Sequence, residues 1–424
     1  MRLTIRNGRV IDPATGHDAI ADVHVADGRI ATIGAPPTGF AADRTINATG
    51  MIVAPGLVDL SARLREPGFE YMATLESEVA AAAAGGVTSL ACPPDTDPPL
   101  DEPGLVAMLK HRARTLNQSR VFPVGALTVG LQGTTLTEMC ELTEAGCVAF
   151  FHADHPITDT NVLMCALRYA STFGYTTWLR PQDHYLARGG VAHDGQVATR
   201  LGLPGIPSCA ETIALSTILQ LARETGARIH LARLSTAAAV DMMRAAKREG
   251  LGVTCDIAVH HAHLCEIDIG FFDGQCHVIP PFRSVRDRDG LRSGLLDGTI
   301  DAICSDHTPV DDDAKQLPFG ESEAGTTGLE LLLPLTLKWA DEAGVSLPAA
   351  LARITTGPAA VLGLDAGRLA PGIPADLCIF DPQRYWRVDR ASLRSMGKNT
   401  PFIGYELRGR VCYTVVDGQV IHEG

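Results

Sequence analysis

Between about residues 55 and 362, short apolar segments alternate with longer stretches that are rich in alanine and leucine. Val87–Ala91 has the composition of a buried strand, whereas Leu75–Ala84 and Ala237–Arg248 have that of helices. Such alternation predicts a parallel sheet, because each helix returns the chain to the edge where the next strand begins. About eight such units in roughly 300 residues predict a (β/α)8 barrel. The other predicted strands are Val121–Leu127, Cys147–Phe151, Thr176–Leu179, Ile229–Leu231, Val253–Ile257 and Ala302–Cys304.

Both ends of the chain have a different pattern, with short strands separated by tight turns. Three dipeptides there are typical of two-residue hairpin turns: Asn7-Gly8, Asp27-Gly28 and Asp417-Gly418. Because both ends share this pattern, we expect residues 1–54 and 363–424 to form one composite β-sandwich domain. Residues 55–362 would then form the barrel domain of this α/β protein.

Composition narrows the class of protein. The chain has 424 residues, of which 46% are hydrophobic and 20% charged, which is ordinary for a globular protein. It has no uncharged apolar run of about 18 residues and no signal-peptide pattern at its start, so we expect neither a membrane span nor secretion. A net charge of −13 argues against nucleic acid as a partner. The 11 cysteines lack CxxC spacing, which favours free thiols in a reducing cytoplasm.

Several motifs in succession resemble the dihydroorotase branch of the amidohydrolase superfamily. The resemblance runs through nearly the whole chain in the family's order, and it implies an amidohydrolase-type barrel. The matching segments are Ala54–Leu60, Leu64–Gly68, Ala82–Thr88, Pro93–Leu100, Ala126–Thr128, Leu201–Pro207, Asp297–Asp301, Ser305–Pro309, Gly328–Glu330 and Gly372–Leu377.

The residues that would bind metal in this family are replaced. The resemblance implies histidines at positions 61 and 63 and at the ends of the fifth and sixth strands. Here those four positions hold Ser61, Arg63, Arg180 and Arg233. Asp306 remains, at the position of the family's general acid/base.

We expect no metal at this degenerate site. Serine is a poor zinc ligand, and a guanidinium group has no lone pair to donate. Two like charges ~4 Å apart repel by roughly 4 kcal/mol even at an effective dielectric constant near 20. Asp306 would therefore be a vestigial general acid/base that pairs with Arg63 or Arg233 in a buried ion network.

Two alternative metal sites stay open in the sequence. After the fourth strand, where the family places a bridging acid, the chain reads Phe151-His152-Ala153-Asp154-His155. Zinc could bind there only through a ligand set outside the family pattern, made of His152, Asp154 and Asp306. The second candidate is the cluster His260-His261-x-His263.

The substrate contacts that the resemblance implies are also altered. Arg65, which would hold the substrate carboxylate, is retained, but Asp95 replaces the asparagine of a Pro-Asn-Thr motif. Ile279 and Val310 replace another asparagine and a histidine. A carboxylate at position 95 would disfavour an anionic substrate.

These observations lead to three functional hypotheses. The first is a dihydroorotase-like protein of pyrimidine biosynthesis that is not an enzyme and supports assembly of the aspartate carbamoyltransferase catalytic subunit, as degenerate chains of this family do; it would be an oligomer. The second is an active dihydroorotase or other cyclic amidohydrolase that hydrolyses a cyclic amide C–N bond at a non-family metal site. The third is a sensor that binds an anion through Arg63, Arg65, Arg180 and Arg233.

Overall fold

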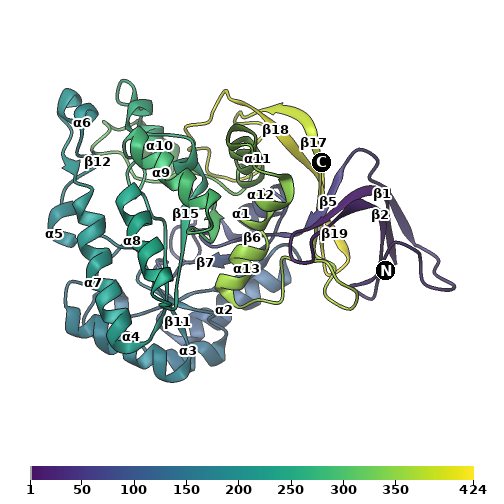
Figure 1. Ribbon diagram of the computed structural model, residues 1–424, viewed down its shortest axis with the longest axis horizontal. Helices are drawn as coiled ribbons and strands as arrows, with labels where there is room; N and C mark the ends of the chain where they lie inside the picture. The colour runs from purple at the N-terminus through teal and green to yellow at the C-terminus, as the bar shows by residue number, and fades with distance from the viewer. Residues whose placement is uncertain (1) are drawn as a thin grey trace.

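The computed structural model describes residues 2–424 and shows a closed barrel of parallel strands surrounded by helices (Figure 1). Its sheet closes where Ala62, just after the first strand, pairs in parallel with His307, just after the last. The predicted barrel is therefore confirmed. Its strands are β6 (Leu57–Asp59), β7 (Val87–Cys92), β8 (Arg120–Pro123) continued by β9 (Gly125–Ala126), β10 (Phe150–Phe151), β11 (Thr176–Leu179), β14 (Arg228–Leu231), β15 (Val253–Ala258) and β16 (Ala302–Cys304).

Helices cover the outside of the barrel because each has one apolar face. In α8, Val240, Met243 and Ala246 are buried at a helical spacing, and the Thr236 side chain caps the first turn. No helix within residues 2–424 has the length and apolar character needed to cross a bilayer. The main helices are α1 (Leu75–Ala84), α2 (Pro103–Thr115), α3 (Met139–Ala145), α4 (Thr160–Phe173), α7 (Cys209–Thr225), α8 (Ala237–Arg248), α9 (Val285–Leu296), α11 (Leu332–Ala343), α12 (Leu347–Ala352) and α13 (Thr356–Leu362).

Shorter elements lie in the connections that follow the strands. They shape the rim at the carboxyl ends of the strands, where barrel proteins carry their functional residues. They are α5 (His184–Ala187), α6 (Gln196–Leu201), α10 (Asp312–Gln316) and the paired strands β12 (Ala192–His193) and β13 (Gly205–Ile206).

The two ends of the chain meet in one eight-stranded sheet that packs as a small β-sandwich beside the barrel (Figure 1). Strand β5 pairs with β17, which joins the amino-terminal strands to the carboxyl-terminal ones. The strands are β1 (Leu3–Asp12), β2 (His17–Ala26), β3 (Arg29–Ile33), β4 (Arg44–Asn47), β5 (Ile52–Pro55), β17 (Leu377–Arg387), β18 (Glu406–Val416) and β19 (Gln419–Glu423).

Two of the three predicted hairpin turns are correct. Asp27-Gly28 joins β2 to β3, and Asp417-Gly418 joins β18 to β19. The prediction for Asn7-Gly8 is wrong, because the dipeptide lies inside β1, where the pairing with β2 shifts register. Asn7 has a φ of 60°, and a side chain on Gly8 would meet Val53 at 2.5 Å. Asn-Gly suits such a bulge as well as a turn, because asparagine tolerates the left-handed conformation.

A long segment between β17 and β18 is fastened to the rim beyond the last barrel strand by two buried polar side chains, Glu78 and Asn399. Glu78 of α1 accepts hydrogen bonds from His307 Nε2 (2.5 Å), the Ser395 hydroxyl (2.6 Å) and the Met396 amide (3.0 Å). The Asn399 side chain binds the Thr308 carbonyl and the Val310 amide on the same rim. These contacts hold the backbone that follows Asp306.

Replacing Glu78 with alanine should destabilise the protein. The change leaves His307, the Ser395 hydroxyl and the Met396 amide without their buried acceptor, which costs on the order of 3 kcal/mol. We expect a lower midpoint in urea unfolding. Glu76→Ala, at an exposed position of the same helix, is the matched control and should leave the midpoint unchanged. Equal midpoints for the two variants would contradict this account.

Candidate functional site

Four residues beyond the ends of the barrel strands have left-handed backbone conformations. Their φ values are 61° for Arg65, 49° for Ala153, 57° for Arg233 and 48° for Asp306. Each costs free energy on the order of 1–3 kcal/mol for a residue with a side chain, and such strain concentrates at functional sites. These strained residues therefore mark the rim at the carboxyl ends of the strands as the place of a functional site.

Asp154 lies at the centre of the site and binds three arginines. Its Oδ2 accepts from Arg63 Nη2 at 2.7 Å, and its Oδ1 lies 2.5 Å from Arg233 Nη2. Arg180 Nε is 2.6 Å from the same Oδ1. The three arginine side chains are 1–6% exposed, so they are removed from water and depend on this carboxylate for compensation.

Two further carboxylates complete the cluster. Asp306 Oδ1 lies 2.8 Å from Arg233 Nη1 and 3.5 Å from Arg63 Nη1, so the pairing expected from the sequence is present. Asp95 Oδ2 accepts from Arg63 Nε at 2.7 Å. We call Arg63, Arg180, Arg233, Asp95, Asp154 and Asp306 the arginine cluster.

Sequence reasoning found the three arginines but missed Asp154 as their main partner. It assigned the counter-charge to Asp306 and considered Asp154 only as part of a zinc site. One signal could have identified it, since three buried guanidinium groups need more than one carboxylate. Asp154 is also the acid that follows the fourth strand, on the same rim as the arginines.

The charges of the cluster influence one another. Burial favours the neutral form of Asp154, but the guanidinium groups of Arg233, Arg180 and Arg63 outweigh it and lower the pKa of Asp154 far below its usual value. Burial raises the pKa of Asp306, and Arg233 and Arg63 oppose that rise only in part. Three cations thus face three acids, and Asp154 is more firmly ionised than Asp306.

These residues do not fit a divalent metal. The arginines have no lone pair, and both oxygens of Asp154 already accept from them. Ser61 Oγ donates to Asp306 Oδ1 at 3.4 Å, so the serine is part of the same network. Residues 2–424 hold no group of three or more His, Cys, Asp or Glu side chains placed to bind a metal.

The alternative zinc site of His152, Asp154 and Asp306 is not assembled. The ring of His152 is held by the Thr128 hydroxyl at Nε2 (2.7 Å) and by the His155 carbonyl at Nδ1 (2.5 Å). Asp154 is occupied by arginines instead. Both nitrogens of His152 are therefore engaged, and the imidazole cannot also ligate a metal.

The cluster of His260, His261 and His263 does not form a metal site either. His261 Nε2 contacts the Pro280 carbonyl at 3.1 Å, and His263 Nε2 contacts the Leu335 carbonyl at 2.9 Å, so these rings point to different backbone groups. Burial lowers the pKa of both to about 4. They are neutral core histidines at ordinary pH.

Arg65 and members of the arginine cluster line a cavity of about 150 Å³. Its Nε donates to the Pro309 carbonyl at 2.8 Å, and its Nη2 lies 3.8 Å from Glu323 Oε1. The cavity wall also includes Asp95 and Ile279. Acidic groups therefore face Arg65 in the space where the resemblance places a substrate carboxylate.

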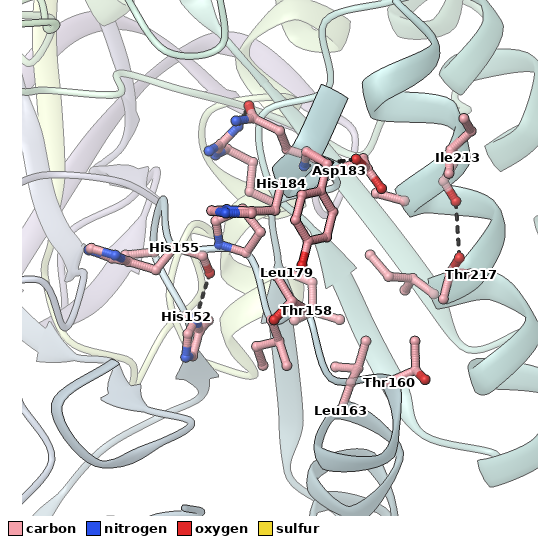
Figure 2. Close-up of a pocket in the computed structure, with 18 residues that line it drawn as sticks. His152, His155, Thr158, Thr160, Leu163, Leu179, Asp183, His184, Ile213 and Thr217 are labelled. Atoms are coloured by element: carbon pink, nitrogen blue, oxygen red, sulfur yellow. Dashed lines mark hydrogen bonds between the residues drawn. The ribbon is translucent and has the colours of Figure 1, made fainter. Parts of the chain in front are cut away.

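A second pocket of about 130 Å³ lies beside the cluster, between β11 and helices α4, α5 and α7 (Figure 2). Arg180 contributes to its wall, but its guanidinium group is bound to Asp154 and Gln182. The labelled side chains that line it are His152, His155, Thr158, Thr160, Leu163, Leu179, Asp183, His184, Ile213 and Thr217. Most of this lining is apolar or uncharged, unlike the arginine cluster.

Comparison with known proteins places these features in context. Residues 50–239 match the family described as "Dihydro-orotase-like", and residues 330–422 match "Amidohydrolase family". The chain is 46% identical to a "Dihydroorotase-like protein" of Pseudomonas aeruginosa and 42% identical to a "Dihydroorotase" of Syntrophotalea carbinolica, over 99–100% of each protein. An L-hydantoinase (dihydropyrimidinase) structure from Arthrobacter aurescens superposes with a TM-score of 0.88 at 25% identity, covering 99% of this chain and 96% of that one.

The arginine cluster predicts a large effect of replacing Asp154 with asparagine. The variant leaves three guanidinium groups with two carboxylates, so the free energy of unfolding should fall by on the order of 3 kcal/mol. Asp95→Asn is the matched comparison, because Asp95 pairs with Arg63 alone and should cost less. Urea denaturation of both variants measures the difference. A smaller loss for Asp154→Asn than for Asp95→Asn would contradict the central place of Asp154.

Proposed function

The chain belongs to the dihydroorotase-like family of the amidohydrolase superfamily, and from this we propose that it is a non-catalytic member that assists assembly of aspartate carbamoyltransferase. In this role the barrel is a structural partner in pyrimidine biosynthesis. The proposal has two parts, the lack of catalysis and the partner, and each has its own support and its own test.

The observation that carries the first part is the convergence of Arg63, Arg180 and Arg233 on Asp154. Hydrolysis of a cyclic amide needs an activated water and a polarised carbonyl group, which the family obtains from a metal. The cluster places guanidinium groups at the metal-ligand positions. Asp306, the family's general acid/base, is bound by Arg233 at 2.8 Å. Because its Oδ1 also lies 3.5 Å from Arg63 Nη1, this oxygen is engaged in the ion network and is not left free for the proton of an attacking water.

The charge balance argues against the anion-sensor hypothesis. Arg63, Arg65, Arg180 and Arg233 are the four cations of the site. They are faced by as many carboxylates: Asp95, Asp154, Asp306 and Glu323. An incoming anion would have to displace one of these acids, so the site offers no free positive charge.

The second part of the proposal rests on the resemblance. Degenerate chains of this kind serve as companions of aspartate carbamoyltransferase. The intact barrel, and the segment between β17 and β18 that Glu78 and Asn399 hold in place, agree with a scaffold that is kept for its shape. A structural partner needs a stable surface and does not need an active pocket.

Metal content and turnover test the first part. We expect the purified protein to bind less than stoichiometric zinc after reconstitution and to hydrolyse dihydroorotate at background rate. Asp306→Ala is the control, because activity that survives in it comes from a contaminating host enzyme. Stoichiometric zinc together with turnover that Asp306→Ala abolishes would show instead an active cyclic amidohydrolase.

Assembly tests the second part. We expect the chain to form a complex of defined stoichiometry with the catalytic subunit of aspartate carbamoyltransferase from the same organism, measured by light scattering after size exclusion. A transferase that assembles and works fully without this chain would refute the partnership.

A further inference from the structure

A cavity of about 410 Å³ lies between the barrel and the β-sandwich, away from the arginine cluster. One wall is formed by α2 and the segment that leads into β8, and the other by the hairpin of β18 and β19. Asn117 and Gln118 precede β8, so the cavity is at the amino ends of the strands, opposite the rim that carries the cluster. Its volume is within the roughly 300–1,000 Å³ that is usual for small-molecule sites.

Arg120 joins the two walls of this cavity. Its guanidinium group pairs with Asp376, which directly precedes β17, and its Nη2 lies 2.5 Å from Asp417 Oδ1 in the hairpin. The Asp417 amide also donates to Asp376 Oδ1 at 3.0 Å. These bonds fix the hairpin against the barrel, so the cavity is preorganised and a ligand need not order its walls.

Two cations on the cavity wall have no counter-ion. Lys110 and Arg114 are one turn apart on α2, and within residues 2–424 neither side chain forms an ion pair or donates a hydrogen bond. The Lys110 ammonium group packs against Gly146, where a Cβ would lie 1.8 Å from Nζ, so the glycine leaves room for it at the wall. Like charges at this helical spacing are unfavourable without a partner.

The cavity is positive although the chain as a whole has a net charge of −13. Among the described residues that line it, the one acid is Asp417, which Arg120 already binds. Lys110 and Arg114 are therefore left to attract an anion from solution, and the walls around them hold no carboxylate that would compete for them.

The rest of the lining suits a flat heterocycle. Val121, Phe122 and Ile421 form an apolar wall, and Phe122 and Ile421 are only half-buried, so apolar surface faces the cavity. Asn117 and Gln118 add side-chain amides that make no hydrogen bond to any of the described residues. Each amide has donors and an acceptor, as the edge of a nucleobase does. Cations, amides and an apolar wall together match the phosphate, the edge and the face of a nucleotide.

We propose that this cavity binds a nucleoside monophosphate, with its phosphate at Lys110 and Arg114. The base lies against Phe122 and Ile421, and its edge meets the amides of Asn117 and Gln118. The site is at the opposite end of the barrel from the arginine cluster, so its occupant takes no part in events at the rim. The inference therefore does not depend on the proposed assembly role.

Isothermal titration calorimetry of the full chain with uridine monophosphate and adenosine monophosphate tests the proposal. We expect one saturable site per chain. Arg114→Gln and Lys110→Gln should each weaken binding about 10-fold, because each removes a charge-assisted contact to the phosphate. Arg114 is exposed, so its replacement leaves the fold intact. Arg168→Gln, at an exposed position of α4 outside the cavity, is the matched control and should bind like the unchanged protein.

Two partial ligands separate the contributions of phosphate and base. Uridine lacks the phosphate and inorganic phosphate lacks the base, so each should bind at least about 10-fold more weakly than uridine monophosphate. Equal affinity for inorganic phosphate and for the nucleotide would show a simple anion site and overturn the proposal. So would the absence of saturable heat at about 1 mM of either nucleotide. Unchanged affinity of Arg114→Gln would place any bound nucleotide elsewhere, which also overturns it.

Discussion

The structure of the site depends on one constraint: buried guanidinium groups must be matched by carboxylates. Three arginines occupy positions where the family resemblance implies metal ligands, and each would be strongly unfavourable alone in the barrel. Asp154 solves most of this problem because its two carboxylate oxygens form ion pairs with all three. Asp95 and Asp306 supply the remaining charge. The cluster thus links the ends of the first, fourth, fifth, sixth and eighth strands through ion pairs.

This link extends beyond the pocket. Arg63 and Arg233 join the ends of the first and sixth strands to Asp306 after the eighth, and Arg233 also reaches the Ile279 carbonyl in the connection between β15 and α9. Glu78 fixes the same rim from the other side through His307 and the segment before β18. A rim fastened in this way suits a partner surface, which needs fixed positions more than it needs motion. That is the physical connection between the altered site and the proposed assembly role.

The similarity to relatives assigns the family of this chain, but it does not by itself assign the chemistry of the few residues in the site. Proteins named dihydroorotase and dihydroorotase-like protein are both similar to this chain over its whole length, at 42% and 46% identity. Overall identity reports on the shared barrel, whose apolar strands and helix faces make up most of the sequence. The ligand positions are a handful of residues that hardly change that value. Chemistry must therefore be judged from Ser61, Arg63, Arg180 and Arg233 themselves.

The sequence by itself determined the barrel and most of its strands and helices, and it identified Ser61, Arg63, Arg180 and Arg233 at positions where the resemblance implies metal ligands. These follow from local periodicity and from residue chemistry, which act over a few positions. It did not predict the place of Asn7-Gly8, because an Asn-Gly pair suits a bulge and a turn equally. Only the tertiary structure decided that Asp154 is the centre of the arginine cluster. This depends on which side chains meet across the barrel, and that is set by long-range packing rather than by neighbours in the chain.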